Sequence, residues 1–198
     1  MVPLRGGARR VADCGCRAGV VAMITIALAD PPELPAGSRD VFLPIIGGPP
    51  PVVAVNPVTA FYRLLTADQR QQRGRLEVCA CLEQAATWRA HGLAMLGDPW
   101  SHRDKDGIAP NAYARRAGCV LPKDYALDGN NVESLCAGSA DPAVMFAALA
   151  ASPSHANHLF GLSDFFRKQD KIGVAVCESP DPQSMFRWYW AIFICRCE

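Results

Sequence analysis

The chain has 198 residues, half of them hydrophobic, and its 20 lysines and arginines nearly balance its 19 acidic residues, giving a formal net charge of +1. This length and apolar content can bury the core of one domain of ordinary size, so we expect one compact domain with extensions. The balanced charge does not favour a nucleic acid partner, and the arginines at positions 70, 73 and 75 lack interleaved aromatics, so we expect a solvated loop there.

The first 29 residues have the pattern of a secretory signal. Four arginines stand before or at the start of an apolar run over residues 18–29, and Ala27 and Ala29 stand where a signal peptidase would cut. The run is shorter than the roughly 20 residues of a membrane-spanning helix. We expect a signal peptide over residues 1–29 and a secreted, extracellular protein without a transmembrane span after cleavage. A start codon miscalled upstream of Met23, or a disordered basic tail, is the alternative.

The nine cysteines are many for this length, and seven remain after residues 1–29. Neither a C-x-x-C repeat nor a downstream H-x-x-x-H is present, so disulfides are favoured over a zinc ribbon. On a helix, Cys79 and Cys81 would point away from each other, whereas on a strand Cys195 and Cys197 would share a face. Because seven is odd, at least one thiol stays free or pairs between chains.

Helix signals begin after a proline-rich linker over residues 30–56. Asn56 is a suitable N-cap, and Pro57 is a suitable first helical residue. Apolar residues at helical spacing then predict a longer helix over residues 75–96. A short helix in "APNAYARRAGC" is expected to end at Gly118.

Two further helices are predicted later in the chain. Asp141 is expected to cap a helix that runs to Ala151. Ser152 and Pro153 open another short helix, which Gly161 ends.

The chain closes with two predicted strands, "KIGVAVC" and "SMFRWYWAIFICRC". Both alternating sets of side chains in the last strand are apolar or aromatic, so both of its faces must be covered. Helices on both sides of a small sheet meet this requirement. We therefore predict an α/β fold, a three-layer α/β/α sandwich.

Five blocks carry a resemblance to a known family. "DPWSHRDKDG" resembles its "fSHxxxDG" segment, "NVESLCAG" its "gENiaaG" block, and "ASPSHANHLFG" its bacterial "SPgHrxnlLG" block. "KIGVAV" resembles its "GVGxa" strand and "FRWYWAIF" its aromatic final strand. The family is the CAP superfamily, also called SCP-like, of cysteine-rich secretory, antigen 5 and pathogenesis-related proteins. The blocks follow family order and imply a CAP/SCP-like domain over residues 57–198, of bacterial type, with a small, mostly antiparallel sheet.

The resemblance implies a cleft with two histidines and two acids, in which several members hold a divalent metal on the histidines. His102, Glu133 and His155 match three of these positions. The second acid has no counterpart, because its place falls in residues 149–152, none of which ionises. Further departures are Ser134 in place of the usual asparagine and an alanine in place of the arginine that often follows the second histidine.

The chemistry of His102, Glu133 and His155 suits a first-row divalent metal, with zinc as the first choice. Three protein ligands would leave one position open for water, as in catalytic zinc sites. Without metal, Glu133 would hydrogen-bond one imidazole and fix its tautomer. His158 shares a helix face with His155 but is expected to be a packing or surface residue, and His91 is not counted as a ligand.

We expect the small residues between Glu133 and His155 to form a helix packed closely on the sheet, so that both side chains reach one cleft. His102 is expected to reach the same cleft from the loop after the long helix.

Among the cysteines, at least two disulfides are expected, and Cys119 with Cys136 is the favoured pair because both flank the loop that carries Glu133.

Two classes of function follow. The first is a secreted binding module whose cleft holds a divalent metal and a small lipid-like or peptide ligand, without turnover. The alternative is a metal-dependent extracellular hydrolase, an esterase, peptidase or nuclease, in which metal-bound water attacks the substrate. The missing second acid favours binding, because hydrolysis usually needs a base besides the metal ligands.

Overall fold

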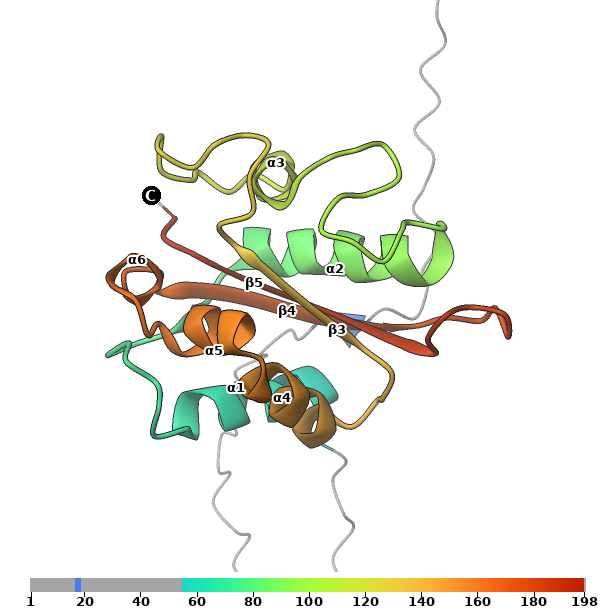
Figure 1. Ribbon diagram of the computed structural model, residues 1–198, viewed down its shortest axis with the longest axis horizontal. Helices are drawn as coiled ribbons and strands as arrows, with labels where there is room; N and C mark the ends of the chain where they lie inside the picture. The colour runs from blue at the N-terminus through green and yellow to red at the C-terminus, as the bar shows by residue number, and fades with distance from the viewer. Residues whose placement is uncertain (1–16, 19–54, 198) are drawn as a thin grey trace, which may run out of the picture.

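The computed structural model describes residues 17–18 and 55–197 of the chain (Figure 1). The predicted linker over residues 30–56 lies outside these residues except at its last two positions. The predicted signal peptide lies outside them except for Arg17–Ala18, which form the short strand β1 and pair with strand β4. A signal cleaved after residue 29 would remove this pairing from the sheet.

The described residues contain six helices, and their starts follow the capping signals of the sequence. The Asn56 side chain accepts a hydrogen bond from the backbone N–H of Val58 at 2.9 Å, and the Asp141 side chain accepts one from Ala143 at 2.8 Å. Gly161 takes the left-handed conformation, with φ of 64°, and ends its helix as predicted. The helices are α1 (Pro57–Ala67), α2 (Ala80–Met95), α3 (Pro110–Arg116), α4 (Pro142–Ala151), α5 (Pro153–Phe160) and α6 (Asp164–Arg167).

Helix α2 begins later than the predicted helix over residues 75–96. Residues Glu77–Val78 form strand β2, which pairs in parallel with the start of β4. Cys79 is extended, with φ of −127°, because its backbone N–H continues this pairing to the carbonyl oxygen of Ile172. The expectation that Cys79 and Cys81 point apart on a helix was wrong for this reason: only Cys81 is helical, and the two sulfur atoms lie 3.3 Å apart.

The sheet is mostly antiparallel, as expected. Strands β3 (Glu133–Ala137), β4 (Lys171–Glu178) and β5 (Trp188–Cys195) form its body, in the order β1-β4-β5-β3. Only β2, which joins β4, is parallel to its partner among the described strands. The predicted strand "KIGVAVC" is confirmed as β4, whereas the last strand begins at Trp188 and not at Ser184.

Strand β3 corrects the prediction that one helix fills the stretch between Glu133 and His155. Glu133 pairs with Phe193, and the ladder continues to Ala137, which pairs with Tyr189. Both faces of β3 are covered, since Leu135 packs on one side of the sheet and Cys136 on the other. A helix becomes possible only after the turn at residues 138–141, where Asp141 caps α4.

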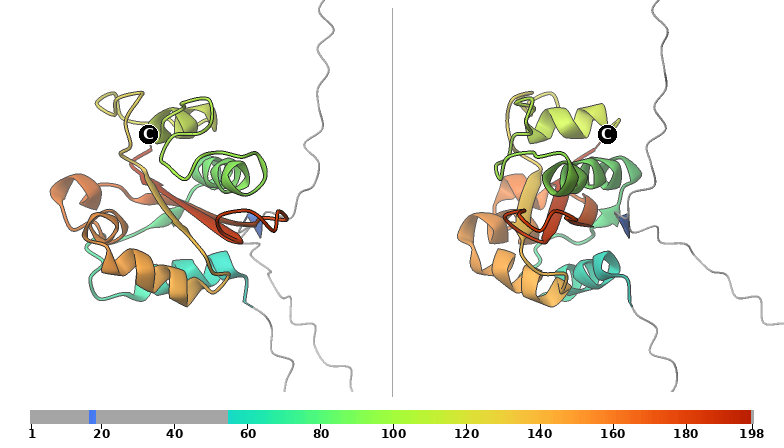
Figure 2. Two further views of the ribbon diagram at one scale, coloured as in Figure 1. Left: turned by 45° about the vertical axis from the view of Figure 1, so that its right-hand side comes forward. Right: turned by 90° about the vertical axis from the view of Figure 1, so that its right-hand side faces the viewer.

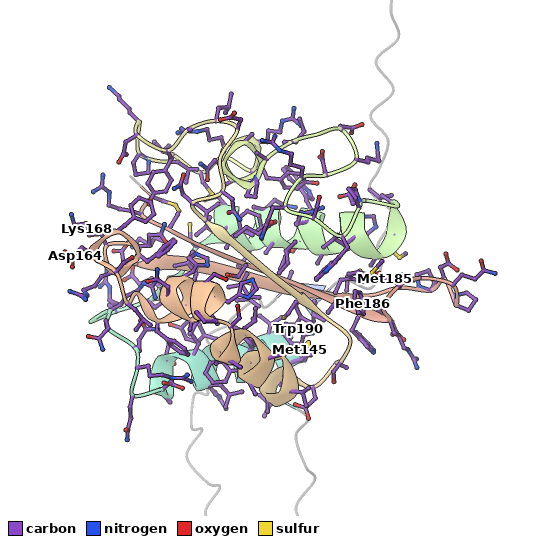
Figure 3. All side chains as sticks on the ribbon, viewed as in Figure 1. Met145, Asp164, Lys168, Met185, Phe186 and Trp190 are labelled. Atoms are coloured by element: carbon purple, nitrogen blue, oxygen red, sulfur yellow. A yellow bond between two sulfur atoms is a disulfide. The ribbon has the colours of Figure 1, made fainter. Side chains whose placement is uncertain are left out.

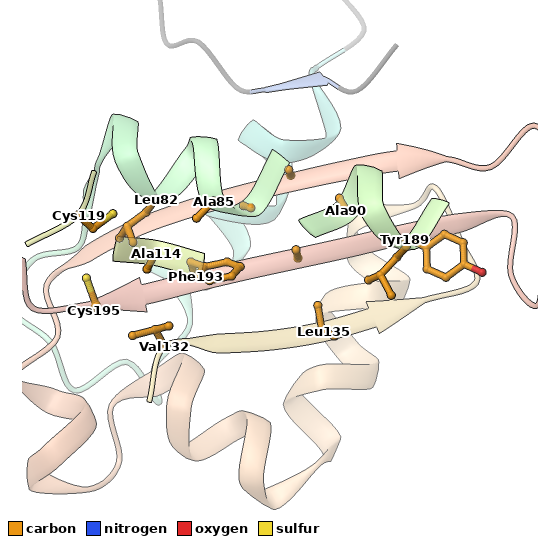
Figure 4. Close-up of a cluster of buried hydrophobic side chains, with 14 of the residues drawn as sticks. Leu82, Ala85, Ala90, Ala114, Cys119, Val132, Leu135, Tyr189, Phe193 and Cys195 are labelled. Atoms are coloured by element: carbon orange, nitrogen blue, oxygen red, sulfur yellow. The ribbon is translucent and has the colours of Figure 1, made fainter. Parts of the chain in front are cut away.

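Two helical layers cover the sheet, which confirms the three-layer α/β/α sandwich (Figure 2). On one face, Leu82 and Ala90 of α2 and Ala114 of α3 pack on Tyr189 and Phe193 (Figure 4). Helices α1, α4 and α5 cover the other face, where Met145 lies beside Trp190 (Figure 3). The side chains of β5 therefore alternate between two apolar layers, as their sequence requires.

Helix α2 lies unusually close to β4. A Cβ atom at Gly173 would overlap the backbone atoms of Leu82 and Glu83. Only glycine leaves room for the helix backbone at this point of the strand. The close approach fixes α2 over the centre of the sheet and, with it, the loop that follows the helix.

The arginine cluster is only partly a solvated loop. Arg73 is 7 % exposed, and its guanidinium donates to the carbonyl oxygens of His158, Leu159 and Phe166. Burial lowers the pKa of Arg73 to about 10. The prediction of a solvated loop was wrong for this residue, because three backbone acceptors at and after the end of α5 replace its water.

Among residues 17–18 and 55–197, no helix combines the length and the apolar character that crossing a membrane requires.

Candidate functional site

The centre of the site is a hydrogen-bonded pair formed by two of the predicted residues. His102 lies in the loop after α2, and Glu133 is the first residue of β3. The Nδ1 atom of His102 is 2.8 Å from Oε1 of Glu133. The Glu133 side chain is fully buried, whereas the His102 side chain is 47 % exposed. An ionised carboxylate only accepts hydrogen bonds, so Nδ1 of His102 is the donor and Nε2 is left unprotonated in the neutral ring.

A buried arginine lies behind this pair. Arg89 of α2 is 1 % exposed; its Nε atom lies 3.3 Å from Oε2 of Glu133, and Nη1 lies 2.8 Å from Oδ2 of Asp98. Its Nη2 also donates to the carbonyl oxygen of Ser101, directly before His102. One guanidinium thus forms ion pairs with two buried carboxylates and holds the loop that carries the exposed histidine.

A glycine on α2 makes room for the second carboxylate. A Cβ atom at Gly92 would overlap the Asp98 carboxylate, and the Asp98 backbone N–H donates to the Gly92 carbonyl oxygen at 3.1 Å. The chain therefore folds back onto the last turn of α2 immediately after the helix ends. This return brings Asp98 to Arg89.

The ionisation of Glu133 is set by opposing influences. Burial is the largest influence and raises the pKa of Glu133 above its usual value, while the hydrogen bond from His102 and the charge of Arg89 partly oppose it. Oε2 of Glu133 makes no hydrogen bond among the described residues, although it faces the guanidinium. The carboxylate thus has one oxygen committed to His102 and the other to an ion pair.

His155 lies on α5, in the first turn of that helix, and is half-buried. Burial lowers its pKa, and the nearby His102 lowers it further. Both influences favour the neutral imidazole, which is the form that binds a metal. His155 therefore lies close enough to His102 for the charge of that ring to act on it.

His158 has a structural role, which confirms it as a packing residue. It is 4 % exposed; Nδ1 lies 2.7 Å from Oγ of Ser134, and Nε2 lies 3.4 Å from the carbonyl oxygen of Ile194. Because the carbonyl only accepts, Nε2 carries the proton and Nδ1 accepts from the serine. Burial first, and then the charge of Arg73, lower the pKa of His158 to about 3.

The structure brings two of the three predicted ligands into contact and leaves the third farther away. A metal ion needs several acidic, histidine or cysteine ligand atoms close together. In the described parts of the chain, three such atoms lie within 4.8 Å of one another in one group, Cys79, Cys81 and Cys197. His102, Glu133 and His155 are not gathered that closely. The residue types still suit a divalent metal, since the neutral His102 ring with Nδ1 bonded to Glu133 has Nε2 free and burial favours the neutral form of His155.

The favoured disulfide between Cys119 and Cys136 is wrong. Cys119 is bonded to Cys81, and Cys136 has a free, buried thiol. Cys136 points into the layer of α1 and α4, whereas Cys119 belongs to the layer of α2 and α3, so the sheet separates them. The expected minimum of two disulfides is met, since Cys195 is bonded to Cys197.

Arg89 and Asp98 are the residues of the site that the sequence did not suggest. Arg89 sits in an apolar stretch of α2, "AATWRAHGLAM", and its side chain points toward the loop at residues 98–103. A charged residue among the buried positions of a helix is a signal that a buried partner exists. That signal was present at Arg89, but the partner could not be located without the loop.

No family model matches the chain, and no curated protein matches it in sequence. Two solved structures are similar to it. One is an outer surface protein from Borrelia burgdorferi, with a TM-score of 0.50 and 20 % identity over 70 % of this chain and 90 % of that one. The other is an extracellular protein containing a SCP domain from Bacillus anthracis, with a TM-score of 0.50 and 13 % identity over 71 % of this chain and 40 % of that one.

The chain has the CAP, or SCP-like, fold of bacterial type. The layered sheet and the order of the five sequence blocks agree with this assignment. At these identities the likeness concerns the fold alone. This chain spans 40 % of the B. anthracis protein, whose remaining part has no counterpart in the comparison.

Proposed function

We propose that this CAP domain is an exported, extracellular binding module that holds a divalent metal, with zinc as the first choice, on the imidazoles of His102 and His155. The observation that carries the proposal is the contact between His102 and Glu133. It commits Nδ1 of the half-exposed ring to a buried carboxylate and, in the neutral ring, leaves Nε2 free to bind a metal. A carboxylate behind a metal-binding histidine fixes its tautomer and raises its basicity.

Glu133 supports the metal in this proposal and does not bind it directly. The guanidinium of Arg89 lies 3.3 Å from the carboxylate oxygen that His102 does not use. A cation placed at that oxygen would be repelled by the arginine. In this proposal Glu133 remains part of the site, but it fixes the tautomer of His102 and is not a direct metal ligand.

The chain's own residues prepare the two imidazoles before any metal arrives. Glu133 and Arg89 fix the His102 ring and its loop, and burial favours the neutral form of His155. When bound on two histidines, a divalent metal supplies open positions for water or for a ligand carboxylate. A zinc ion shared by both rings would need one ring nitrogen of His102 and one of His155, each about 2.1 Å from it.

A cavity that could hold a small ligand lies beside the ion pair of Arg89 and Asp98. A cavity of about 400 Å³ is lined by Asp98, Trp100, Ser179, Met185 and Tyr189 among others. Its volume falls within the roughly 300–1,000 Å³ of small-molecule sites. Trp100, whose ring packs edge to face on Phe186, directly precedes the loop segment of His102. This setting supports a lipid-like or peptide ligand with apolar parts.

Export is supported by the basic start of the chain with its apolar run, by the disulfides, and by the extracellular and outer-surface titles of the two similar structures. The test is the intact mass of the protein recovered from the medium or surface of an expressing bacterium. A chain that begins near residue 30 is expected. Protein that stays in the cytoplasm with Met1 retained would contradict export.

A metal-dependent hydrolase is the second candidate, favoured by one observation. His102 with Glu133 behind it resembles the oriented imidazole of a general base. The absence of an ionisable residue in Leu149–Ser152 still argues against turnover. Ester, amide and phosphodiester substrates tested with zinc distinguish the two functions: turnover that His102→Ala abolishes would favour the hydrolase.

Metal binding is tested by calorimetric titration of metal-free protein with zinc. One site per chain is expected, and affinity should fall by more than about 100-fold in His102→Ala and in His155→Ala, since loss of a direct ligand should outweigh loss of a residue that only orients one. His91→Ala is the matched control on α2 and should bind as the wild type does. Equal affinity in the wild type and a folded His102→Ala, His155→Ala double variant would overturn the metal site.

A further inference from the structure

Five cysteines gather at the end of the sheet where β4 begins and β5 ends. The backbone N–H of Cys79 donates to the carbonyl oxygen of Ile172, and Cys195 pairs with Lys171 on the same strand. The two C-x-C sequences of the described residues, at positions 79–81 and 195–197, therefore meet where β4 begins and β5 ends. Figure 4 shows Cys119 and Cys195 facing the same layer. The cluster consists of Cys79, Cys81, Cys119, Cys195 and Cys197.

Four sulfur atoms of this cluster are paired and one is not. Cys81 is bonded to Cys119 and Cys195 to Cys197, while Cys79 keeps its thiol. The Cys79 sulfur lies 3.3 Å from the Cys81 sulfur, and the sulfur atoms of Cys79, Cys81 and Cys197 all lie within 4.8 Å of one another. A free thiol is thus held in contact with one sulfur of an existing disulfide.

We propose that Cys79, Cys81 and Cys119 form an intramolecular thiol–disulfide exchange centre, in which Cys79 attacks the disulfide between Cys81 and Cys119. The Cys79 thiolate forms a new bond to the Cys81 sulfur, and the bond between Cys81 and Cys119 breaks. Cys119 leaves with the electron pair and takes up the proton that Cys79 released. One disulfide and one thiol are present before and after, so no external oxidant or reductant is needed.

Cys136, the other free thiol of the described residues, is not placed for such an exchange. Cys136 is buried between the sheet and α4, and burial raises its pKa to about 12. In the described part of the chain no disulfide lies within the layer of Cys136, and its raised pKa leaves little thiolate to attack one. Cys79 instead is half-buried, at the start of α2, in direct contact with Cys81.

The exchange alters a long-range link of the fold. The bond between Cys81 and Cys119 joins residues 38 apart and ties the start of α2 to the loop after α3. A bond between Cys79 and Cys81 spans two residues and constrains the chain locally. Because a disulfide that closes a longer loop restricts the unfolded chain more, the exchange releases a constraint on the layer that contains α3 and the His102 loop. This inference does not depend on the proposed metal site.

The test is disulfide mapping of the full chain. Protein held at mildly alkaline pH is quenched with acid, alkylated, digested and analysed by mass spectrometry. Two species are expected: one with Cys79 alkylated and Cys81 bonded to Cys119, and one with Cys119 alkylated and Cys79 bonded to Cys81. Cys79→Ser should remove the alkylated Cys119 peptide, whereas the matched variant Cys136→Ser should retain both species.

The variant Cys119→Ser tests separately whether Cys79 and Cys81 can form a bond. In Cys119→Ser, refolded in a glutathione redox buffer whose disulfide is the oxidant, the bond between Cys79 and Cys81 should form as the main product. Absence of this bond in both the wild type and Cys119→Ser would overturn the proposal. Its presence in Cys119→Ser but not in the wild type would also overturn it, because that result would show proximity without exchange.

Discussion

The Nδ1 atom of His102 lies 2.8 Å from Oε1 of Glu133 and joins the loop after α2 to the first residue of β3. Because this contact fixes which ring nitrogen is free, it should matter for zinc binding even though Glu133 touches no metal in our proposal. We expect Glu133→Ala to weaken zinc binding by about 10–100-fold. Competition with a fluorescent zinc chelator measures this change.

Glu133→Gln is the informative companion variant, since its amide oxygen still accepts from Nδ1 of His102. It should lose less affinity than Glu133→Ala. Glu77→Gln, on the far β2 strand, is the control and should match the wild type. Unchanged affinity in Glu133→Ala would show that the contact has no part in binding.

Arg89 should be essential for stability. Arg89→Met removes the charge that two buried carboxylates share, because the side chains of Asp98 and Glu133 are 3 % and 0 % exposed. Leaving buried charges uncompensated costs about 3–5 kcal/mol of the free energy of unfolding. Denaturant unfolding measures the loss.

Arg187→Met is the matched control for Arg89. Arg187 pairs with Glu178 on the surface, with side chains 73 % and 42 % exposed. An exposed pair of this kind contributes less than about 1 kcal/mol. If both variants lost the same small amount of stability, Arg89 would not be the electrostatic centre of the site.

The fold was predictable because its signals are local. Asn56, Asp141 and Gly161 mark helix ends through contacts within a few residues, and the doubly apolar pattern of β5 requires two covering layers. Strand β3 was missed because "ESLCA" is short and both of its faces are buried, so it shows no alternation.

The site was only partly predictable, because its interactions join distant segments. The resemblance supplied His102, Glu133 and His155, but the role of Glu133 depends on Arg89, 44 positions earlier in the chain. The disulfide of Cys119 depended on which side of the sheet each cysteine faces. The face of Cys136 followed from β3, which the sequence did not reveal.

Gly173→Ala should disrupt the contact between α2 and β4. The new Cβ atom would overlap backbone atoms of Leu82 and Glu83, which cannot rotate away as a side chain would. Overpacking here should cost about 3 kcal/mol of unfolding free energy. Gly74→Ala, where no atom lies within 4 Å of the added carbon, should change it by less than about 0.5 kcal/mol. Equal thermal midpoints for both variants would contradict the close approach.

His158 should make the protein sensitive to acid. Its pKa is lowered to about 3 in the folded chain, from 6.5 in the unfolded chain. Between these values the unfolded chain binds a proton that the folded chain does not, so stability falls as the pH falls through this window. From about pH 7 to about pH 4.5, this one group should remove about 2.5 kcal/mol.

His158→Asn provides the comparison for this prediction. It removes the titrating ring while keeping an acceptor for the Ser134 hydroxyl, which now lies 2.7 Å from Nδ1. The variant should be less stable at neutral pH but lose less stability on acidification than the wild type. Parallel pH profiles from urea unfolding would contradict the buried, neutral state of His158.

The central claim, a metal held by two imidazoles with a carboxylate behind one of them, is tested most directly by anomalous diffraction at the zinc edge from crystals of the zinc-loaded protein. One peak is expected about 2.1 Å from nitrogen atoms of both His102 and His155, with Glu133 still hydrogen-bonded to Nδ1 of His102. A peak that touches neither imidazole, or zinc found only on the sulfur atoms of Cys79, Cys81 and Cys197, would contradict it.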